Sequence, residues 1–155
     1  MGMRIEEVGD RIEIRRLVDE YALAVDTRDA ERFAALFAAD ATLSVVEPDE
    51  QEPSLAYTGR EELLTVVELV ASFKATYHVM TNHVVQIDGD TATAGTYGLT
   101  HHLSESDERG LYDTLMLLTY QDELRRVDGR WRFQARRIER QWTNYIEAEK
   151  ARLVG

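Results

Sequence analysis

Carboxylates, imidazoles and phenols are the side chains through which this sequence could do chemistry. The 155 residues include four histidines and no cysteine, so a thiolate nucleophile and a thiolate metal site are both excluded. A histidine beside a carboxylate makes an effective general base, because the carboxylate orients the ring and stabilises its charged form. We therefore ask which histidine could meet which acid.

The first candidate acid is Asp26, which follows a helical pattern. Apolar residues recur at three- and four-residue steps, which predicts a helix with one buried stripe made of Ile14, Leu17, Val18, Tyr21 and Val25. Asp26 lies about 100° around the helix from Val25, so its carboxylate belongs to the edge of that stripe. The alternative is a solvated helix end, since Thr27-Arg28-Asp29 resembles a break before a second helix.

The histidines lie in segments whose alternation predicts β-strands. In TYHVMTNHVVQI, a period of two places His78, Met80 and Asn82 on one face and His83 on the other. A lone strand histidine is more often structural than catalytic, and His83 keeps that interpretation. His101 and His102 are adjacent, so only one of them faces inward. His102 shares its face with the small residues of ATAGTYGLTHHL, which leave room for a ligand or a close-packed helix and favour His102.

A third predicted strand could supply the wall of a binding site. Tyr112, Met116, Leu118 and Tyr120 share one of its faces. Such a stripe is ordinarily part of a core. It also suits an apolar pocket with phenol hydroxyls at its ends.

Several classes of function find no support in the residues. Four histidines with Asp26 invite a metal site, but no H-x-x-x-H spacing is present, so we expect no metal. Neither a glycine-rich phosphate loop nor a G-x-S-x-G elbow occurs, so we expect no nucleotide cofactor and no serine hydrolase. Eighteen basic against 29 acidic residues give a net charge of −11, which argues against nucleic acids and anionic membranes as partners. Without a signal-like or membrane-spanning apolar run, we expect a cytoplasmic protein.

The order of the predicted elements indicates an α+β fold in one domain spanning residues 1–155. We expect helices beginning near Asp10, at Asp29 and behind a capping box at Thr58-Gly59-Arg60-Glu61. Four long strands follow from residue 75, and the turn signals at 88–90 and 128–129 predict consecutive antiparallel hairpins. Because these strands carry apolar residues on both faces, one face should pack on the helices and the other on a partner chain. The expected assembly is a homo-oligomer, either a dimer or a trimer.

The chain resembles the nuclear transport factor 2-like superfamily, and within it the SnoaL-like group of dehydratases and dehydrochlorinases. The resemblance rests on AVDTRDAERFAALFAADATL, on His78-Val79-Met80-Thr81-Asn82, on the Asp88-Gly89-Asp90 turn and on DGRWRF before the last strand. It implies a cone-shaped α+β barrel, in which three helices and a curved antiparallel sheet enclose an apolar pocket. Many unrelated functions share such a fold.

The resemblance also implies site residues and an activity. Asp26 and His78 match the catalytic dyad of the group, His102 matches a second pocket histidine, and Tyr21 matches a tyrosine of the bile-acid dehydratases. The residues expected to contact the substrate are Asn82, Tyr112, Met116, Tyr120 and Arg140. Two tyrosines that hold a water in the fungal dehydratase appear here as Val25 and Val45, so that substrate is not implied.

The implied reaction is a cofactor-independent, dehydratase-type elimination on a small hydrophobic cyclic molecule, of terpenoid, steroid or polyketide type. The alternatives are an isomerase or cyclase, and a non-catalytic binding module that resembles the small subunit of ring-hydroxylating dioxygenases.

Overall fold

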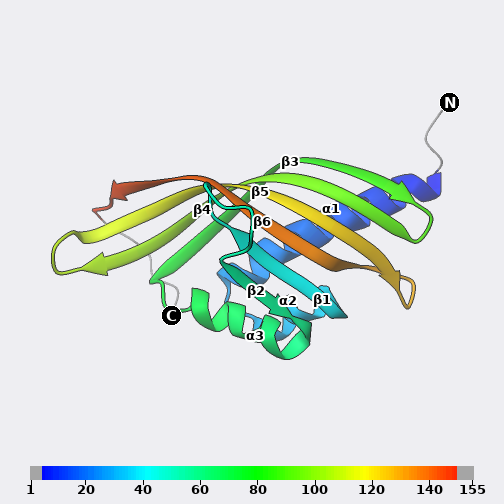
Figure 1. Cartoon of the computed structure of the whole chain (residues 1–155), viewed down its shortest axis with the longest axis horizontal. Helices are drawn as coiled ribbons and strands as arrows, with labels where there is room; N and C mark the ends of the chain where they lie inside the picture. Colours follow the sequence, from blue (N-terminus) through cyan, green and yellow to red (C-terminus); the bar gives the residue numbers. More distant parts are fainter. Residues whose placement is uncertain (1–4, 150–155) are drawn as a thin grey trace.

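The computed structural model describes residues 5–149, in which three helices cover one face of a curved, open six-stranded sheet. In Figure 1 the long strands arch over α2 and α3, and α1 runs along the same side of the sheet. The elements in chain order are α1 (Ile5–Asp26), α2 (Ala30–Ala35), β1 (Phe37–Val46), β2 (Leu55–Thr58), α3 (Gly59–Val70), β3 (Ala75–Asp88), β4 (Thr91–Ser106), β5 (Gly110–Val127) and β6 (Arg130–Glu147). The predicted α+β class is confirmed.

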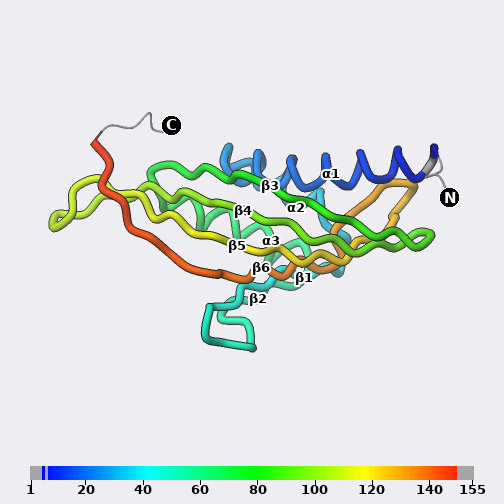
Figure 2. Tube along the Cα trace, turned by 90° about the horizontal axis from the view of Figure 1, so that it is seen from above, coloured from blue at the N-terminus to red at the C-terminus, as the bar shows by residue number. Residues whose placement is uncertain are grey.

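The strand order is β2-β1-β6-β5-β4-β3, which Figure 2 shows from above. The pairs β3–β4, β4–β5 and β5–β6 are antiparallel, so the predicted consecutive hairpins are confirmed. The strand β1 pairs with β6 in parallel, and the short β2 lies at one edge. The sequence pattern did not reveal β2, because four residues are too few to establish an alternation.

The first helix begins earlier than expected, whereas the second begins where the sequence predicts. The first helix is already formed at Ile5, and Asp10 lies within it, where its carboxylate accepts hydrogen bonds from Arg126 and Trp131. Asp29 does cap α2, accepting from the Arg32 backbone N–H at 3.0 Å.

The third helix begins without the predicted capping box. The Thr58 side chain makes no cap hydrogen bond, and Glu62 rather than Glu61 accepts from the Thr58 backbone N–H at 2.6 Å. The helix ends at Val70. None of the helices within residues 5–149 combines the length and apolar character that crossing a bilayer requires.

The core lies between the three helices and the concave face of the sheet. A cluster of aromatic rings forms its centre, where Tyr21 packs within 6.4 Å of Phe33, Phe37, Tyr120 and Phe133, measured between ring centroids. Near the start of β4, residues Ala92 and Ala94 are buried in the same core. The core therefore closes around α1 at one end and leaves space under the opposite half of the long strands.

Candidate active site

Asp26 and His78 meet at the end of α1. The helix stops there because Arg28 adopts a left-handed backbone (φ 60°), and the Arg28 guanidinium donates to the Val25 carbonyl at 2.9 Å. Asp26 therefore projects from the last turn of α1 toward β3. Its Oδ1 lies 2.6 Å from His78 Nδ1, so Nε2 is the ring nitrogen that stays free.

Two further hydrogen bonds hold the Asp26 carboxylate in place. The backbone N–H of His78 donates to Oδ2 at 2.8 Å, and the Thr76 hydroxyl donates to Oδ1 at 2.9 Å. Burial alone would raise the pKa of Asp26, but the hydrogen bonds from His78 and Thr76 outweigh burial and lower it. Asp26 is thus a carboxylate near neutral pH, fixed against an imidazole whose side chain is 7% exposed.

His78 lines a cavity of about 240 Å³ beneath the sheet. The polar lining residues are Tyr21, Ser72, His78, Thr100, His102, Tyr120 and Arg140. The remaining lining residues are apolar or aromatic: Val25, Leu43, Val45, Leu55, Tyr57, Val66, Leu69, Val70, Phe73, Met116, Leu118 and Ile138. A concave apolar site with a few converging polar groups is typical of small-molecule binding.

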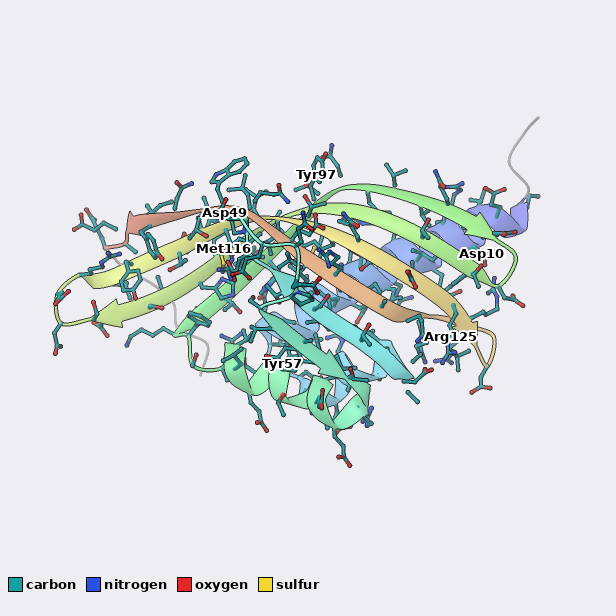
Figure 3. The ribbon with its side chains drawn as sticks, in the orientation of Figure 1. Asp10, Asp49, Tyr57, Tyr97, Met116 and Arg125 are labelled. Atoms are coloured by element: carbon teal, nitrogen blue, oxygen red, sulfur yellow. The ribbon has the colours of Figure 1, made fainter. Side chains whose placement is uncertain are left out.

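The cavity opens between β2 and α3. Leu55 of β2 and Leu69 of α3 both line it, yet their side chains are 43% and 51% exposed. Tyr57, which Figure 3 labels below the sheet beside α3, lies on the same edge of the cavity. Leu55 and Tyr57 escaped the sequence interpretation because β2 was not recognised.

His102 faces the cavity and His101 faces away from it. Every second residue of β4, from Ala92 to His102, is buried, so the strand keeps its alternation along its whole length. The ring of His102 lies 5.5 Å from that of His78 and 4.6 Å from that of Phe73, between centroids. Burial, together with the neighbouring His78, lowers the pKa of His102 to about 3, so this imidazole is neutral near pH 7.

Two of the cavity tyrosines, Tyr21 and Tyr120, contact Arg136, and Tyr120 also lies against Gly98. A Cβ at Gly98 would lie 2.6 Å from the Tyr120 ring. Only glycine at this position leaves enough space for the ring. The Arg136 guanidinium stacks 4.0 Å from the centroid of Tyr21 and 4.4 Å from that of Tyr120. Burial raises the pKa of Tyr21 to about 12 and that of Tyr120 well above its usual value, so both phenols keep their protons.

Arg136 forms a fully buried ion pair with Asp122, and the sequence interpretation missed both residues. Their charged atoms lie 3.2 Å apart, and both side chains have no solvent exposure. Burial, opposed by Arg136, raises the pKa of Asp122 to about 6. The signal that could have found Arg136 is the period of two in β6, where it shares a face with Ile138 and Arg140.

Three of the expected substrate contacts line the cavity and two do not. Met116, Tyr120 and Arg140 line it, and Arg140 also donates to Glu47 at 2.8 Å. Asn82 is exposed on the outer side of the sheet, because a β-bulge between Met80 and His83 reverses the faces of β3. His83 instead pairs with the buried Thr96 and lies on the His78 face, so the prediction that Asn82 and not His83 shares that face is wrong.

Tyr112 lies on the expected face of β5 but beyond the cavity. It packs beside Tyr145 at 6.4 Å between ring centroids and under the Arg109 guanidinium at 5.6 Å. Tyr112 is not among the residues that line the cavity, so the structure does not bring it together with the other expected substrate contacts. Within residues 5–149, histidines and acids do not gather in groups of three that could ligate a metal ion.

Comparison with known proteins identifies a family and a set of structural relatives. Residues 6–137 match the SnoaL-like domain family. A structure of Rv3472, a protein of unknown function from Mycobacterium tuberculosis, is 26% identical, with a TM-score of 0.75 over 90% of this chain and 76% of that chain. A protein from Novosphingobium aromaticivorans with a provisional scytalone dehydratase name is 25% identical, with a TM-score of 0.77 over 96% and 95%.

A hexachlorocyclohexane dehydrochlorinase of the LinA type 2 class shares the fold. Its TM-score is 0.79 at 21% identity, over 97% of this chain and 98% of that chain. No curated protein matches the sequence.

Proposed function

Because the chain belongs to the SnoaL-like domain family, we propose that it is a lyase that removes water from a small cyclic molecule through general base catalysis by His78. The observation that carries this proposal is the Asp26–His78 contact of 2.6 Å at the wall of an apolar cavity. Support comes from relatives named as a dehydratase and a dehydrochlorinase, which are both names for elimination reactions.

His78 supplies the base. Since Nδ1 donates to the Asp26 carboxylate, Nε2 carries the lone pair that accepts a proton from the substrate carbon next to an activating carbonyl. The electrons of that C–H bond form the new double bond as the hydroxyl leaves with its bonding pair. Asp26 stabilises the resulting imidazolium, and this arrangement contributes roughly 10²- to 10⁴-fold to the rate. The departing hydroxide takes the proton back from His78, so water is released and the base is regenerated.

Tyr21, Tyr120 and His102 stabilise the oxygen atoms of the substrate. The two phenols line the cavity in their protonated form, so they donate to a carbonyl oxygen or to the leaving hydroxyl. His102 is neutral and its Nδ1 is buried without a hydrogen-bond partner among the described residues. An unpaired buried acceptor is tolerated better than an unpaired donor, so the His102 proton resides on Nε2, where it donates to the substrate.

The cavity selects a small and uncharged substrate. Its volume of about 240 Å³ suits one or two rings and is below the usual range for drug-sized ligands. The lining residue Arg140 already pairs with Glu47 at 2.8 Å, and His78 is neutral when it acts as the base. A charged substrate would lose its hydration without gaining a free counter-charge. Mono- and bicyclic β-hydroxy ketones meet both conditions.

The test is a panel of such β-hydroxy ketones, followed by mass spectrometry and by the ultraviolet absorbance of the conjugated product. We expect the product mass to fall by one water, and we expect His78→Ala to abolish turnover while the circular dichroism spectrum stays unchanged. The matched control is His101→Ala, which removes an imidazole from the same sheet outside the cavity and should leave turnover intact. An unchanged product mass would identify an isomerase, and full activity of His78→Ala would remove His78 from the mechanism.

A further inference from the structure

A half-buried arginine is connected to the Asp26–His78 pair through a threonine. Arg28 follows the end of α1, and its Nη1 donates to the Thr76 hydroxyl at 2.6 Å. The Thr76 hydroxyl in turn donates to Oδ1 of Asp26 at 2.9 Å, and the same Oδ1 lies 2.6 Å from His78 Nδ1. These contacts form one chain of hydrogen bonds from Arg28 to the imidazole of His78.

The direction of this chain of hydrogen bonds is fixed by the chemistry of its two ends. A guanidinium only donates, so the Thr76 oxygen must direct a lone pair toward Arg28. The hydroxyl proton is then directed to the Asp26 carboxylate, which only accepts. Without Arg28, the hydroxyl could turn its proton elsewhere and present a lone pair to Oδ1, which would repel the carboxylate. Arg28 therefore sets the orientation of the Thr76 hydroxyl.

The backbone of Arg28 is unfavourable for an arginine. Its φ of 60° lies in the left-handed region, which glycine adopts readily and other residues rarely adopt. The side chain turns back to the end of α1, where Nη1 also donates to the Val25 carbonyl at 2.9 Å. Ending the helix does not require a guanidinium, because glycine ends helices in the same backbone conformation. A strained residue hydrogen-bonded to a reactive pair indicates a role in the function of that pair.

The charges of Arg28 and Asp26 also interact. Burial lowers the pKa of Arg28, and the negative charge of Asp26 opposes this change. Thr76, which hydrogen-bonds to both groups, is 4% exposed, so water screens their interaction only weakly. A cation close to Asp26 favours the carboxylate form that the proposed mechanism requires.

We propose that Arg28 is a positioning residue that holds Asp26, through Thr76, in the orientation that activates His78. This inference rests on the proposed use of His78 as the base. Arg28 is not among the residues that line the cavity, so it acts on the pair and not on the substrate. Loss of the guanidinium should therefore lower kcat and leave KM nearly unchanged.

Two substitutions at the same position separate positioning from stability. Arg28→Ala and Arg28→Gly both remove the guanidinium, but only glycine relieves the left-handed backbone. We expect Arg28→Gly to unfold at a higher urea concentration than Arg28→Ala. We expect both variants to lower kcat for dehydration by about 10- to 100-fold. Activity that follows stability, with Arg28→Gly close to the wild type, would overturn the proposal.

A double variant tests whether Arg28 acts through Thr76. Arg28→Ala and Thr76→Val break the same chain of hydrogen bonds, so the double variant should lose no more kcat than the more impaired single variant. Losses that multiply in the double variant would show that Arg28 does not act through Thr76.

Thr27→Val is the matched control. The Thr27 hydroxyl donates to the Leu23 carbonyl at 2.7 Å at the same end of α1, and among the described residues it makes no hydrogen bond to Thr76. Thr27→Val should leave kcat unchanged. A loss equal to that of Arg28→Ala would reduce the role of Arg28 to capping the helix.

Proton NMR of the free protein gives a readout that needs no substrate. The proton between His78 Nδ1 and Asp26 should give a far-downfield signal, which His78→Gln should abolish. We expect Arg28→Ala and Arg28→Gly to raise the exchange rate of this proton with water at least about 10-fold, the factor that corresponds to one hydrogen bond. Thr27→Val should leave the exchange rate unchanged.

The NMR result separates the failure of this inference from the failure of the proposed function. Wild-type exchange rates in both Arg28 variants would overturn the role of Arg28. A wild type whose signal depends on Arg28 as expected, but which dehydrates no ketone, would support that role and contradict the proposed dehydration.

Discussion

Two histidine–aspartate pairs of the same geometry lie on opposite faces of one sheet. In each pair, Nδ1 of the histidine is 2.6 Å from a carboxylate oxygen: His78 with Asp26 inside, and His101 with Asp113 outside. Their surroundings differ. The His78 side chain is 7% exposed and that of His101 is 41% exposed. Asp26 receives two further hydrogen bonds, whereas Oδ1 of Asp113 is buried without a partner among the described residues.

The comparison teaches that the contact itself does not make a catalytic base. A base needs a free nitrogen directed into a space that a substrate can occupy and that excludes bulk water. His78 has such a cavity beside it, and His101 has solvent. The outer pair therefore serves as an internal control for every experiment on the inner one.

Replacing Asp26 and Asp113 by asparagine should give the largest difference in activity between the two pairs. We expect Asp26→Asn to lower kcat by about 10²- to 10⁴-fold, because an amide neither stabilises the imidazolium nor fixes the proton on Nδ1. Asp113→Asn should leave kcat unchanged. Initial rates of water loss from the same ketone measure both. Equal rates for the two variants would make the pairs equivalent and contradict the role of the cavity.

A third pair extends the comparison to complete burial. Arg136→Met leaves the Asp122 carboxylate buried without its cation and should lower the free energy of unfolding by about 3–5 kcal/mol. The double variant Asp122→Leu/Arg136→Met should recover most of this loss, because it removes both charges. His101→Ala, at the exposed pair, should cost less than about 1 kcal/mol. Urea unfolding measures the free energy of unfolding of all three variants. If Arg136→Met loses no more of it than His101→Ala does, the Asp122–Arg136 pair is not shielded from solvent as the structure indicates.

The cavity histidine without an acid partner should dominate the pH dependence of stability. The pKa of His102 is about 3 in the folded chain and 6.5 in the reference state, so the unfolded chain binds a proton that the folded chain does not. This contribution is present above pH 6.5 and is lost as the pH falls toward 3. It amounts to about 3 kcal/mol between pH 7 and pH 4.

His102→Gln should abolish this contribution, which urea unfolding at both pH values can measure. Asp122 acts in the opposite sense, since its pKa is raised to about 6 and its contribution is lost as the pH rises through that value. The wild type and His102→Gln both retain Asp122. The difference between the pH dependences of their unfolding free energies therefore isolates the contribution of His102. Identical slopes would show that His102 is not buried as a neutral ring.

The smallest effect concerns the hydroxyl that supports Asp26. Thr76→Val removes the 2.9 Å hydrogen bond to Oδ1 at a residue that is 4% exposed, and should cost about 1 kcal/mol. Thr81→Val, whose hydroxyl donates to the Tyr97 carbonyl in an exposed position, is the control and should cost less. Thermal unfolding compares the two. If Thr81→Val loses more stability than Thr76→Val, the Thr76 hydroxyl does not help to hold Asp26 in place.

Regular segments were predictable from the sequence, and irregular ones were not. The strand β4 alternates without interruption, so the period of two correctly described the face of His102. The bulge in β3 has no sequence signature of its own, and it turned Asn82 outward. The sequence also gives no signal for the left-handed backbone of Arg28, because that conformation is typical of glycine rather than arginine.

Long-range pairing set a second limit. In the sequence, Asp122 and Arg136 look like ordinary charged residues of two strands, and only the sheet register brings them together. The position of Thr76 could have been predicted from the sequence, because Thr76 lies two residues before His78 and so shares its face. The position of Leu55 at the cavity entrance could not have been predicted, since it depends on a strand of four residues.

Proton abstraction by His78 is measured most directly as hydrogen exchange without elimination. A saturated cyclic ketone that lacks a leaving group can only lose and regain its α-proton, so in heavy water it gains deuterium, which proton NMR follows. The wild type and His101→Ala should catalyse this exchange, and His78→Ala should reduce it to the rate without enzyme. Exchange by His78→Ala at the wild-type rate would contradict the account.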